Sequence, residues 1–257
     1  MFPDAAALLL EHWSCETRCE GLPAPLRPAT RQQAYDIAAE IGRLKGQPTA
    51  GWKIAATSEA GQRHINVDGP LGAHIYTDRL RPPGAAVPLG RNIMRVAEAE
   101  FAFMLATDLP PRSLPYSEAE VTAAVGGLCL SIEIPDSRYS DFTAVGAHQL
   151  IADTACACWL VLSPPVAFAW RDLDLRRHEI VGLRNGIEVS RGAGLAALGG
   201  PLTALTWMAN EAARYCGGLK AGQFVTTGTC LKPFDIAPGD RIAADYGVLG
   251  RITAEII

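Results

Sequence analysis

The sequence predicts an α+β fold in which N-terminal helices precede a largely antiparallel or mixed β-sheet. Apolar residues recur at helical spacing near the N-terminus, and short apolar segments typical of strands fill much of the remainder. Asn185-Gly186 marks a tight hairpin turn between two of these segments. Helices and strands do not alternate regularly, so a parallel βαβ sheet is not expected.

The N-terminal part is predicted to form two helices. Asp4 can cap a helix over Ala5–Trp13, and Thr30 can begin a second helix over Arg31–Leu44. Neither helix can bury its apolar face alone, so both must pack on the main body or on a partner subunit. We therefore expect a helical extension with the first strand in residues 1–80 and a β-rich catalytic core in residues 81–257, although the two can form one domain.

Strand and turn signals then follow one another. Trp52–Ala56 and Val96–Leu105 are expected to be strands. Ser117–Glu120 is a capping-box pattern that opens a helix through about Val125. Gly126-Gly127 is expected to end this helix before a strand that carries Glu133.

The C-terminal part contains one further helix and several strand candidates. The helix is expected over Leu202–Cys216, closed by Gly217-Gly218. The strands are expected at Ala155–Leu162, His178–Leu183, Ile187–Ser190, Phe224–Thr227, Arg241–Asp245 and Ile252–Ile257.

Composition excludes several classes of protein. Of the 257 residues, 49% are hydrophobic and 19% are charged, and the net charge of −4 offers no basic surface for a nucleic acid. No apolar run approaches the roughly 18 residues of a membrane helix, and the first residues lack the basic region of a signal peptide. We therefore expect a cytoplasmic protein. The seven scattered cysteines predict free thiols, not a disulfide framework.

Three glutamates stand inside apolar segments: Glu98 and Glu100 in one, Glu133 in another. A carboxylate removed from water is costly unless it is paired or bound to a metal. Residues i and i+2 of a strand face the same side, so Glu98 and Glu100 would reach into one site. A third carboxylate would complete an oxygen site suited to Mg²⁺ or Mn²⁺. The alternative is that all three are unrelated and that the first two are solvated.

Two further segments have residues that could carry chemistry. Lys53 has no acid near it in sequence. It either points to solvent, which its spacing favours, or occupies a site where desolvation lowers its pKa and makes it an acid/base. The hydroxyl-rich segment Thr226–Thr229 can bind an anion through backbone N–H groups, or it is a plain loop.

Taken in order, these segments resemble the fumarylacetoacetate hydrolase superfamily, and within it the branch of 2-keto-4-pentenoate hydratases and 4-oxalocrotonate decarboxylases. The likeness runs nearly end to end. It rests on Gly51-Trp52-Lys53-Ile54, Glu98-Ala99-Glu100, Glu133 with Pro135-Asp136-Ser137-Arg138, Asp153, Gly200-Pro201-Leu202, Trp207-Met208-Ala209-Asn210 and Thr227-Gly228-Thr229.

The resemblance implies a mixed β-roll or barrel-like core with N-terminal helices, a bound Mg²⁺ (or Mn²⁺) and a homo-oligomer that can associate with a sibling pathway enzyme. It implies a short 2-oxo or 2-hydroxydienoate acid from aromatic-compound catabolism as the substrate. The residues it implicates are Glu98, Glu100 and Glu133 for the metal, Lys53 and Asp153 for catalysis, and Thr229, Gly228, Leu71 and His74 for the substrate.

The resemblance leaves the reaction open. The leading expectation is a hydratase that adds water to a 2-hydroxy-2,4-dienoate and yields a 4-hydroxy-2-oxo acid. Hydratases tend to carry an acid where this chain has Leu71, which favours the alternative, a 2-oxo-3-hexenedioate decarboxylase. His74 is either a substitute for that acid or a surface histidine. An acylpyruvate-type C–C hydrolase and a non-catalytic partner subunit are further alternatives; the retained Lys53 and glutamates argue against the latter.

Overall fold

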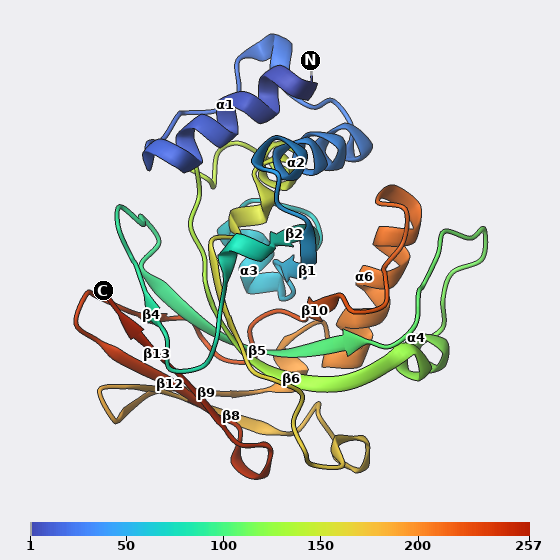
Figure 1. Cartoon of the computed structure of the whole chain (residues 1–257), viewed down its shortest axis with the longest axis vertical. Helices are drawn as coiled ribbons and strands as arrows, with labels where there is room; N and C mark the ends of the chain where they lie inside the picture. Colours follow the sequence, from blue (N-terminus) through green and yellow to red (C-terminus); the bar gives the residue numbers. More distant parts are fainter. Residues whose placement is uncertain (1) are drawn as a thin grey trace.

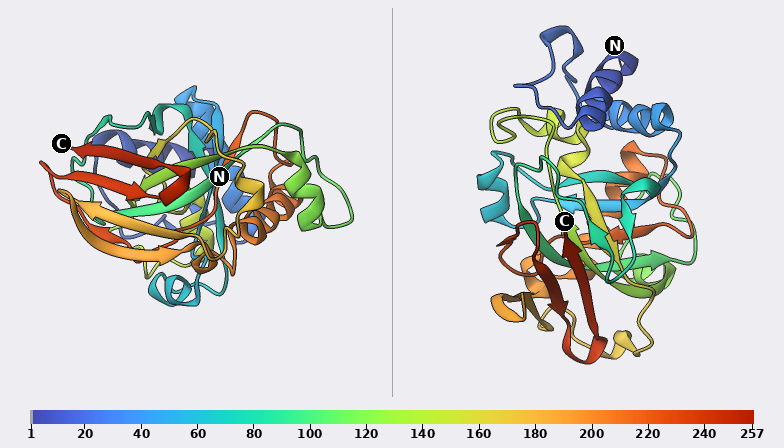
Figure 2. Two further views of the ribbon diagram at one scale, coloured as in Figure 1. Left: turned by 90° about the horizontal axis from the view of Figure 1, so that it is seen from below. Right: turned by 60° about the vertical axis from the view of Figure 1, so that its left-hand side comes forward.

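A computed structural model of the chain describes residues 2–257. Two β-sheets share an apolar core, a long helix lies beside the larger sheet, and two N-terminal helices cover one end of the molecule (Figure 1). In the right-hand view of Figure 2 the N-terminal helices and the smaller sheet lie at opposite ends. The expected α+β class with a curled, mixed sheet is confirmed.

The larger sheet has eight strands in the order β2-β1-β10-β5-β6-β7-β3, with β11 paired to β5. Most neighbours are antiparallel, but β1 and β10 run parallel, as do β3 and β7. The strands are β1 (Thr49–Ala55), β2 (Leu71–Tyr76), β3 (Leu80–Arg81), β5 (Val96–Leu105), β6 (Val125–Ile134), β7 (Trp159–Leu162), β10 (Phe224–Thr226) and β11 (Phe234–Asp235).

The smaller sheet has five strands in the order β4-β13-β12-β8-β9. They are β4 (Ala86–Val87), β8 (Glu179–Arg184), β9 (Ile187–Ala193), β12 (Arg241–Asp245) and β13 (Arg251–Ile256). Asn185 and Gly186 connect β8 to β9 with φ angles of 54° and 81°, so the predicted hairpin turn is confirmed.

The helices are α1 (Phe2–Cys15), α2 (Arg31–Lys45), α3 (Glu59–His64), α4 (Glu118–Ala124), α5 (Ala147–Ala152) and α6 (Pro201–Tyr215). The Thr30 side chain caps α2, and Ser117 and Glu120 form the predicted capping box of α4. Helices α1 and α2 bury their apolar faces against β2 and α5, so they pack on the main body. The division of the chain at residue 80 stays a prediction.

Two expectations from the sequence differ from the structure, and one six-residue strand is absent from those expectations. Ala155–Leu162 is a strand only from Trp159, because residues 154–156 form a left-handed turn. Gly126 and Gly127 begin β6 instead of ending α4; a side chain at Gly127 would meet Pro165 at 2.8 Å. Strand β2 was not predicted, because it is buried on both faces and lacks the alternating pattern of a half-buried strand.

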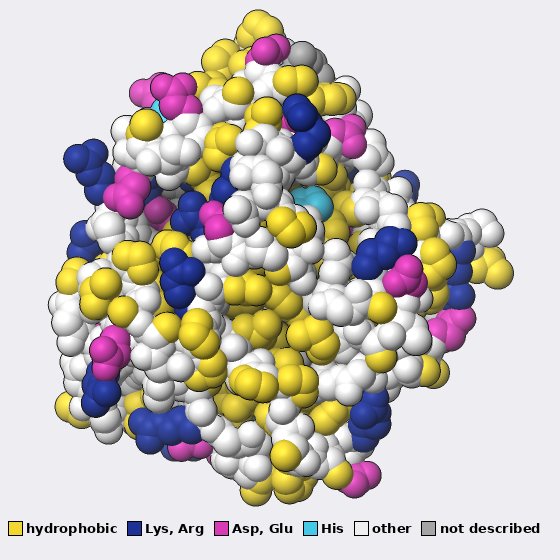
Figure 3. Space-filling model, in the orientation of Figure 1, with side chains coloured by type: hydrophobic (Ala, Val, Ile, Leu, Met, Phe, Trp, Pro, Cys, Tyr) yellow, Lys and Arg dark blue, Asp and Glu magenta, His cyan; other side chains and the backbone are white. Residues whose placement is uncertain are grey.

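Among residues 2–257, no helix is long and apolar enough to cross a membrane. The seven cysteines are free thiols, as predicted. In Figure 3, hydrophobic side chains gather near the middle of one face, and charged side chains lie mostly around its edge.

Candidate active site

Two neighbouring strands bring the three predicted carboxylates together. Glu98 on β5 lies directly opposite Glu133 on antiparallel β6, and Glu100 follows two residues later on the same face. One carboxylate oxygen of each glutamate lies within 4.8 Å of the other two. The structure thus places the side chains as their spacing predicts, while their role as metal ligands stays a prediction.

Lys53 joins this carboxylate cluster from β1. Its side chain is buried, and its Nζ lies 2.6 Å from Oε1 of Glu133. Nζ also donates to the carbonyl oxygen of Ala155 at 3.0 Å. The solvent-facing orientation favoured by the local sequence is therefore wrong, because an acid 80 positions further along the chain compensates the buried ammonium.

Burial and mutual repulsion control the charges of these groups. Burial, together with the charge of Glu133, raises the pKa of Glu98 to about 7, and burial with the charges of Glu133 and Glu98 raises the pKa of Glu100. Burial also raises the pKa of Glu133, against the attraction of Lys53. Burial alone would lower the pKa of Lys53, but the charges of Glu133 and Glu98 outweigh it and raise the value. Lys53 is therefore an ammonium, contrary to the lowered pKa expected for a buried lysine.

The donor set fits a hard divalent cation. Glu133 is fully buried; the Lys53 ammonium lies 2.6 Å from its Oε1, and among the described residues no hydrogen-bond donor contacts its Oε2. Oε2 of Glu100 accepts one from the backbone N–H of Gly228 at 3.0 Å. Full ionisation of the three carboxylates beside the Lys53 ammonium would leave an excess of two negative charges, which burial and mutual repulsion disfavour as long as no cation is bound. A Mg²⁺ or Mn²⁺ ion would neutralise that excess and occupy the free oxygen lone pairs.

The cluster opens into a cavity of about 920 Å³. Lys53, Glu98 and Glu100 line it, and most of its wall is apolar. The apolar side chains include Ile54, Ile65, Leu71, Met94 and Leu150. The cavity also has polar lining residues that the sequence does not predict, because they come from separate elements and carry no local motif: His64, Arg191 and Lys232. A cavity of this size and polarity is typical of a small-molecule site.

Of the four predicted substrate contacts, two line the cavity and two do not. Leu71 and Thr229 line the cavity, although the Thr229 hydroxyl donates to the carbonyl oxygen of Leu231 within its own turn. Gly228 has a φ of 92° and contributes its N–H to Glu100. A side chain at Gly228 would meet Oγ1 of Thr57 at 2.2 Å, so only glycine fits here.

His74, a predicted substrate contact, does not line the cavity. It pairs across the strands with Trp52, whereas Lys53 pairs with Ala73, so His74 and Lys53 face opposite sides of the sheet. A ring nitrogen of His74 lies 3.0 Å from Oγ1 of Thr49. Burial lowers the pKa of His74 to about 4, so the ring is neutral.

Asp153, the second residue predicted to be catalytic, does not line the cavity. Its carboxylate is fully buried and forms an ion pair with Arg138. It also accepts hydrogen bonds from Ser137 Oγ at 3.1 Å and from Trp13 Nε1 at 3.3 Å. Asp153 therefore has structural contacts: its carboxylate holds Arg138, Ser137 and Trp13 together in the protein interior.

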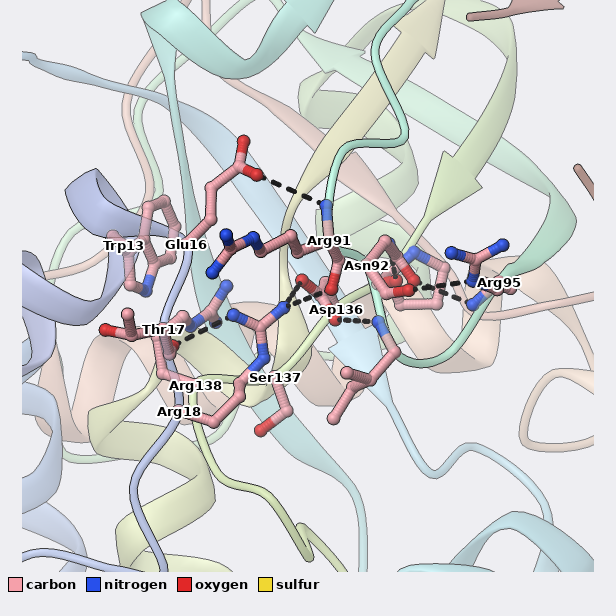
Figure 4. Close-up of polar contacts among 12 residues, drawn as sticks. Trp13, Glu16, Thr17, Arg18, Arg91, Asn92, Arg95, Asp136, Ser137 and Arg138 are labelled. Carbon is pink, nitrogen blue, oxygen red and sulfur yellow. Dashed lines mark hydrogen bonds and ion pairs between the residues drawn. The ribbon is translucent and has the colours of Figure 1, made fainter. Parts of the chain in front are cut away.

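A second polar network lies around Asp136, two residues before Arg138 in the chain (Figure 4). Arg18, after α1, forms an ion pair with Asp136 and donates to the carbonyl oxygen of Arg91 at 3.0 Å. The Asp136 carboxylate also accepts from the backbone N–H of Ile93 at 3.0 Å. Arg18 thus connects the segment after α1 to Asp136, which lies just beyond the C-terminal end of β6.

No family model matches the chain. The chain is 31% identical to a 2-keto-4-pentenoate hydratase of Burkholderia vietnamiensis, over 92% of the chain and 87% of that protein. It is 31% identical to a 4-oxalocrotonate decarboxylase of Pseudomonas sp., over 89% of the chain and 86% of that protein.

Two solved structures extend these likenesses. One is the 4-oxalocrotonate decarboxylase from Pseudomonas putida G7 complexed with magnesium and adipate, with a TM-score of 0.89 and 26% identity over 100% of the chain and 97% of that structure. The other is a fumarylacetoacetate isomerase/hydrolase family structure from Oleispira antarctica, with a TM-score of 0.59 and 17% identity over 80% of the chain and 93% of that structure. The second likeness establishes the fold alone.

Proposed function

The chain belongs to the family of 2-keto-4-pentenoate hydratases and 4-oxalocrotonate decarboxylases in the fumarylacetoacetate hydrolase superfamily, and from this premise we propose that it is a divalent-metal-dependent hydratase. Its substrate is a 2-hydroxy-2,4-dienoate, and its product is a 4-hydroxy-2-oxo acid. The enzyme is thus a lyase of aromatic-compound catabolism.

The observation that carries this proposal is the meeting of Glu98, Glu100 and Glu133 with Lys53 beside one apolar cavity. This cluster also argues against a non-catalytic subunit, which would have no need to keep three carboxylates and an ammonium out of water. The three glutamates would hold Mg²⁺. Bound there, the ion would attract the substrate's carboxylate and stabilise negative charge on its C2 oxygen.

The protein's own residues supply orientation and a proton. The Lys53 ammonium would donate a hydrogen bond to the C1 carboxylate or the C2 oxygen. As the dienol ketonises, it would deliver a proton to C5 and recover one from the 2-hydroxyl. Leu71 and the other apolar side chains of the cavity would enclose the carbon chain and limit the entry of water. The Gly228 N–H keeps the Glu100 carboxylate in place. Water then adds at C4 of the unsaturated ketone.

The second candidate is decarboxylation of 2-oxo-3-hexenedioate. Leu71 favours it, because this apolar residue lines the cavity at the position where hydratases tend to carry an acid. Both reactions need the same stabilisation of negative charge on the C2 oxygen, so the metal cluster does not distinguish them.

One assay with two substrates separates the candidates. The purified enzyme with Mg²⁺ is given either 2-hydroxypenta-2,4-dienoate or 2-oxo-3-hexenedioate. Loss of the dienoate's ultraviolet absorbance without release of CO₂ supports the hydratase. Release of CO₂ from the second substrate supports the decarboxylase, and turnover of neither substrate contradicts both assignments.

The proposal also covers the cellular location and the oligomeric state of the enzyme. A cytoplasmic location agrees with the seven free thiols. We expect a homo-oligomer that can associate with a sibling enzyme of the same pathway; light scattering of the purified protein, alone and mixed with that enzyme, tests both expectations.

A further inference from the structure

Three consecutive residues between α5 and β7 have a backbone conformation that side chains disfavour. The φ angles of Thr154, Ala155 and Cys156 are 54°, 44° and 64°. Residues other than glycine seldom enter this left-handed region, because Cβ then approaches the following carbonyl oxygen. A run of three such residues persists only where the surroundings hold it in place.

Arg138 spans this turn. Its Nη2 donates to the carbonyl oxygen of Asp153 at 2.7 Å, and its Nη1 donates to that of Ala157 at 3.1 Å. These two carbonyls belong to the residues immediately before and after the turn. Nε and the backbone N–H of Arg138 both donate to the Asp153 carboxylate, and the two side chains are 4% and 0% exposed. The planar guanidinium therefore fixes both ends of the turn at once.

The carbonyls inside the turn also have donors. The backbone N–H of Asp136 donates to the carbonyl oxygen of Cys156 at 2.9 Å. Nζ of Lys53 donates to the carbonyl oxygen of Ala155 at 3.0 Å. The turn is thus the link between the buried Arg138–Asp153 pair and the ammonium of the proposed active site. Asp136 is itself held by Arg18, as Figure 4 shows.

We infer that Arg138 and Asp153 are positioning residues for Lys53. They hold residues 154–156 in the left-handed conformation, and that conformation aims the Ala155 carbonyl at Nζ. Nζ then has one fixed place between this carbonyl and Glu133. The inference rests on the proposed function in one respect, namely that Lys53 acts on the substrate.

The substitution Arg138→Lys tests the inference with the least damage to the core. A lysine keeps a positive charge beside Asp153, but a single ammonium cannot span both carbonyls. We expect kcat to fall about tenfold or more, because misplacement of a catalytic group slows the chemical step. The KM for the substrate and the Kd for Mg²⁺ should stay within about threefold of the wild type, since the three glutamates are untouched.

A matched control and a second variant accompany the test. Glu211→Gln removes another ion pair, between Arg31 of α2 and Glu211 of α6, away from this turn; it should lower the Tm and leave kcat unchanged. Asp153→Asn keeps the shape of its side chain and should repeat the kinetic pattern of Arg138→Lys, so the inference stays testable if one of the two variants does not fold.

Crystal structures of the wild type and of the folded variant provide a readout without activity. We expect the contact between Nζ of Lys53 and the Ala155 carbonyl in the wild type and its loss in the variant. An unchanged contact, an unchanged kcat, or a loss of Mg²⁺ affinity in proportion to kcat would overturn the inference. If the wild type turns over neither substrate, the proposed function fails, while the crystallographic contact still decides whether Arg138 positions Lys53.

Discussion

The Lys53 ammonium lies 2.6 Å from a carboxylate oxygen of Glu133, and the two side chains are 4% and 0% exposed. Removing two ions from water is costly, and their attraction offsets the cost only when further polar partners are present. Lys53 also donates to the Ala155 carbonyl, but Oε2 of Glu133 accepts no hydrogen bond from the described residues. A buried carboxylate with an unpartnered oxygen destabilises a core, but it can bind a cation. The arrangement is therefore more typical of a metal-binding active site than of a structural ion pair.

Replacing Lys53 should separate catalysis from metal binding. Lys53→Met is expected to lower kcat by about 100-fold or more, because the proton donor is lost. Mg²⁺ binding should be retained or tightened, since a positive charge beside the carboxylates has been removed. Ultraviolet assays and calorimetry measure the two quantities. Lys220→Met, at an exposed lysine paired with Asp108, is the control and should change neither. Weaker Mg²⁺ binding in Lys53→Met would contradict the assignment.

Neutralising Glu100 should have opposite effects on stability with and without metal. Burial and two neighbouring acids raise the pKa of Glu100, so its charged form destabilises the fold. In EDTA, Glu100→Gln should therefore melt at a higher temperature than the wild type. Saturating Mg²⁺ should reverse the order, because a ligand at 100 times its Kd stabilises the wild type by about 2.7 kcal/mol. Scanning calorimetry under both conditions checks this, and an equal Mg²⁺-dependent rise in Tm for both proteins would refute it.

His74 should contribute to loss of stability in acid. Its pKa in the fold is about 4, below the unfolded value of about 6.5. Between these values the unfolded chain binds a proton that the native protein does not, so stability falls as the pH is lowered from 6.5 towards 4. From pH 7 to pH 5, the wild type should lose about 2 kcal/mol more than His74→Phe, which keeps a ring between Trp52 and Tyr76. Urea unfolding at the two pH values measures the difference, and equal losses would show that His74 is not the responsible group.

Gly228 should be needed for both stability and metal binding. Gly222 is the matched control, because its φ is 82°, compared with 92° for Gly228, but nothing lies within 4 Å of a side chain added there. Gly222→Ala should cost about 1 kcal/mol from backbone strain alone. Gly228→Ala should cost about 3 kcal/mol, since Cβ collides with Thr57. It should also weaken Mg²⁺ binding by moving the N–H from Glu100. Equal effects of the two substitutions, measured by urea unfolding and calorimetry, would contradict this role.

The sequence predicts the features of the site that depend on local spacing. The i,i+2 placement of Glu98 and Glu100 follows from the strand period, and the strand itself is marked by its apolar residues. The capping box and the Asn185-Gly186 hairpin are likewise local signals that the structure reproduces. The family resemblance, and not local spacing, predicts that Glu133 and Lys53 share one site.

Features that depend on distant partners could not be predicted from local patterns. The orientation of Lys53 is decided by Glu133, and the orientation of His74 by the register of β1 against β2. Residues 154–156 resemble the start of a strand because no glycine marks their positive φ angles. Arg138, 16 residues earlier in the chain, holds them instead.

The central claim is that Glu98, Glu100 and Glu133 form one divalent-metal site. Calorimetric titration of Mg²⁺ into the wild type and into each single Glu→Gln variant tests it most directly. We predict one Mg²⁺ per chain in the wild type and affinity at least about 10-fold weaker in every variant. Glu179→Gln, at a cavity-lining carboxylate paired with Arg191 and outside the cluster, should bind as the wild type does. Undiminished Mg²⁺ affinity in all three cluster variants would contradict the account.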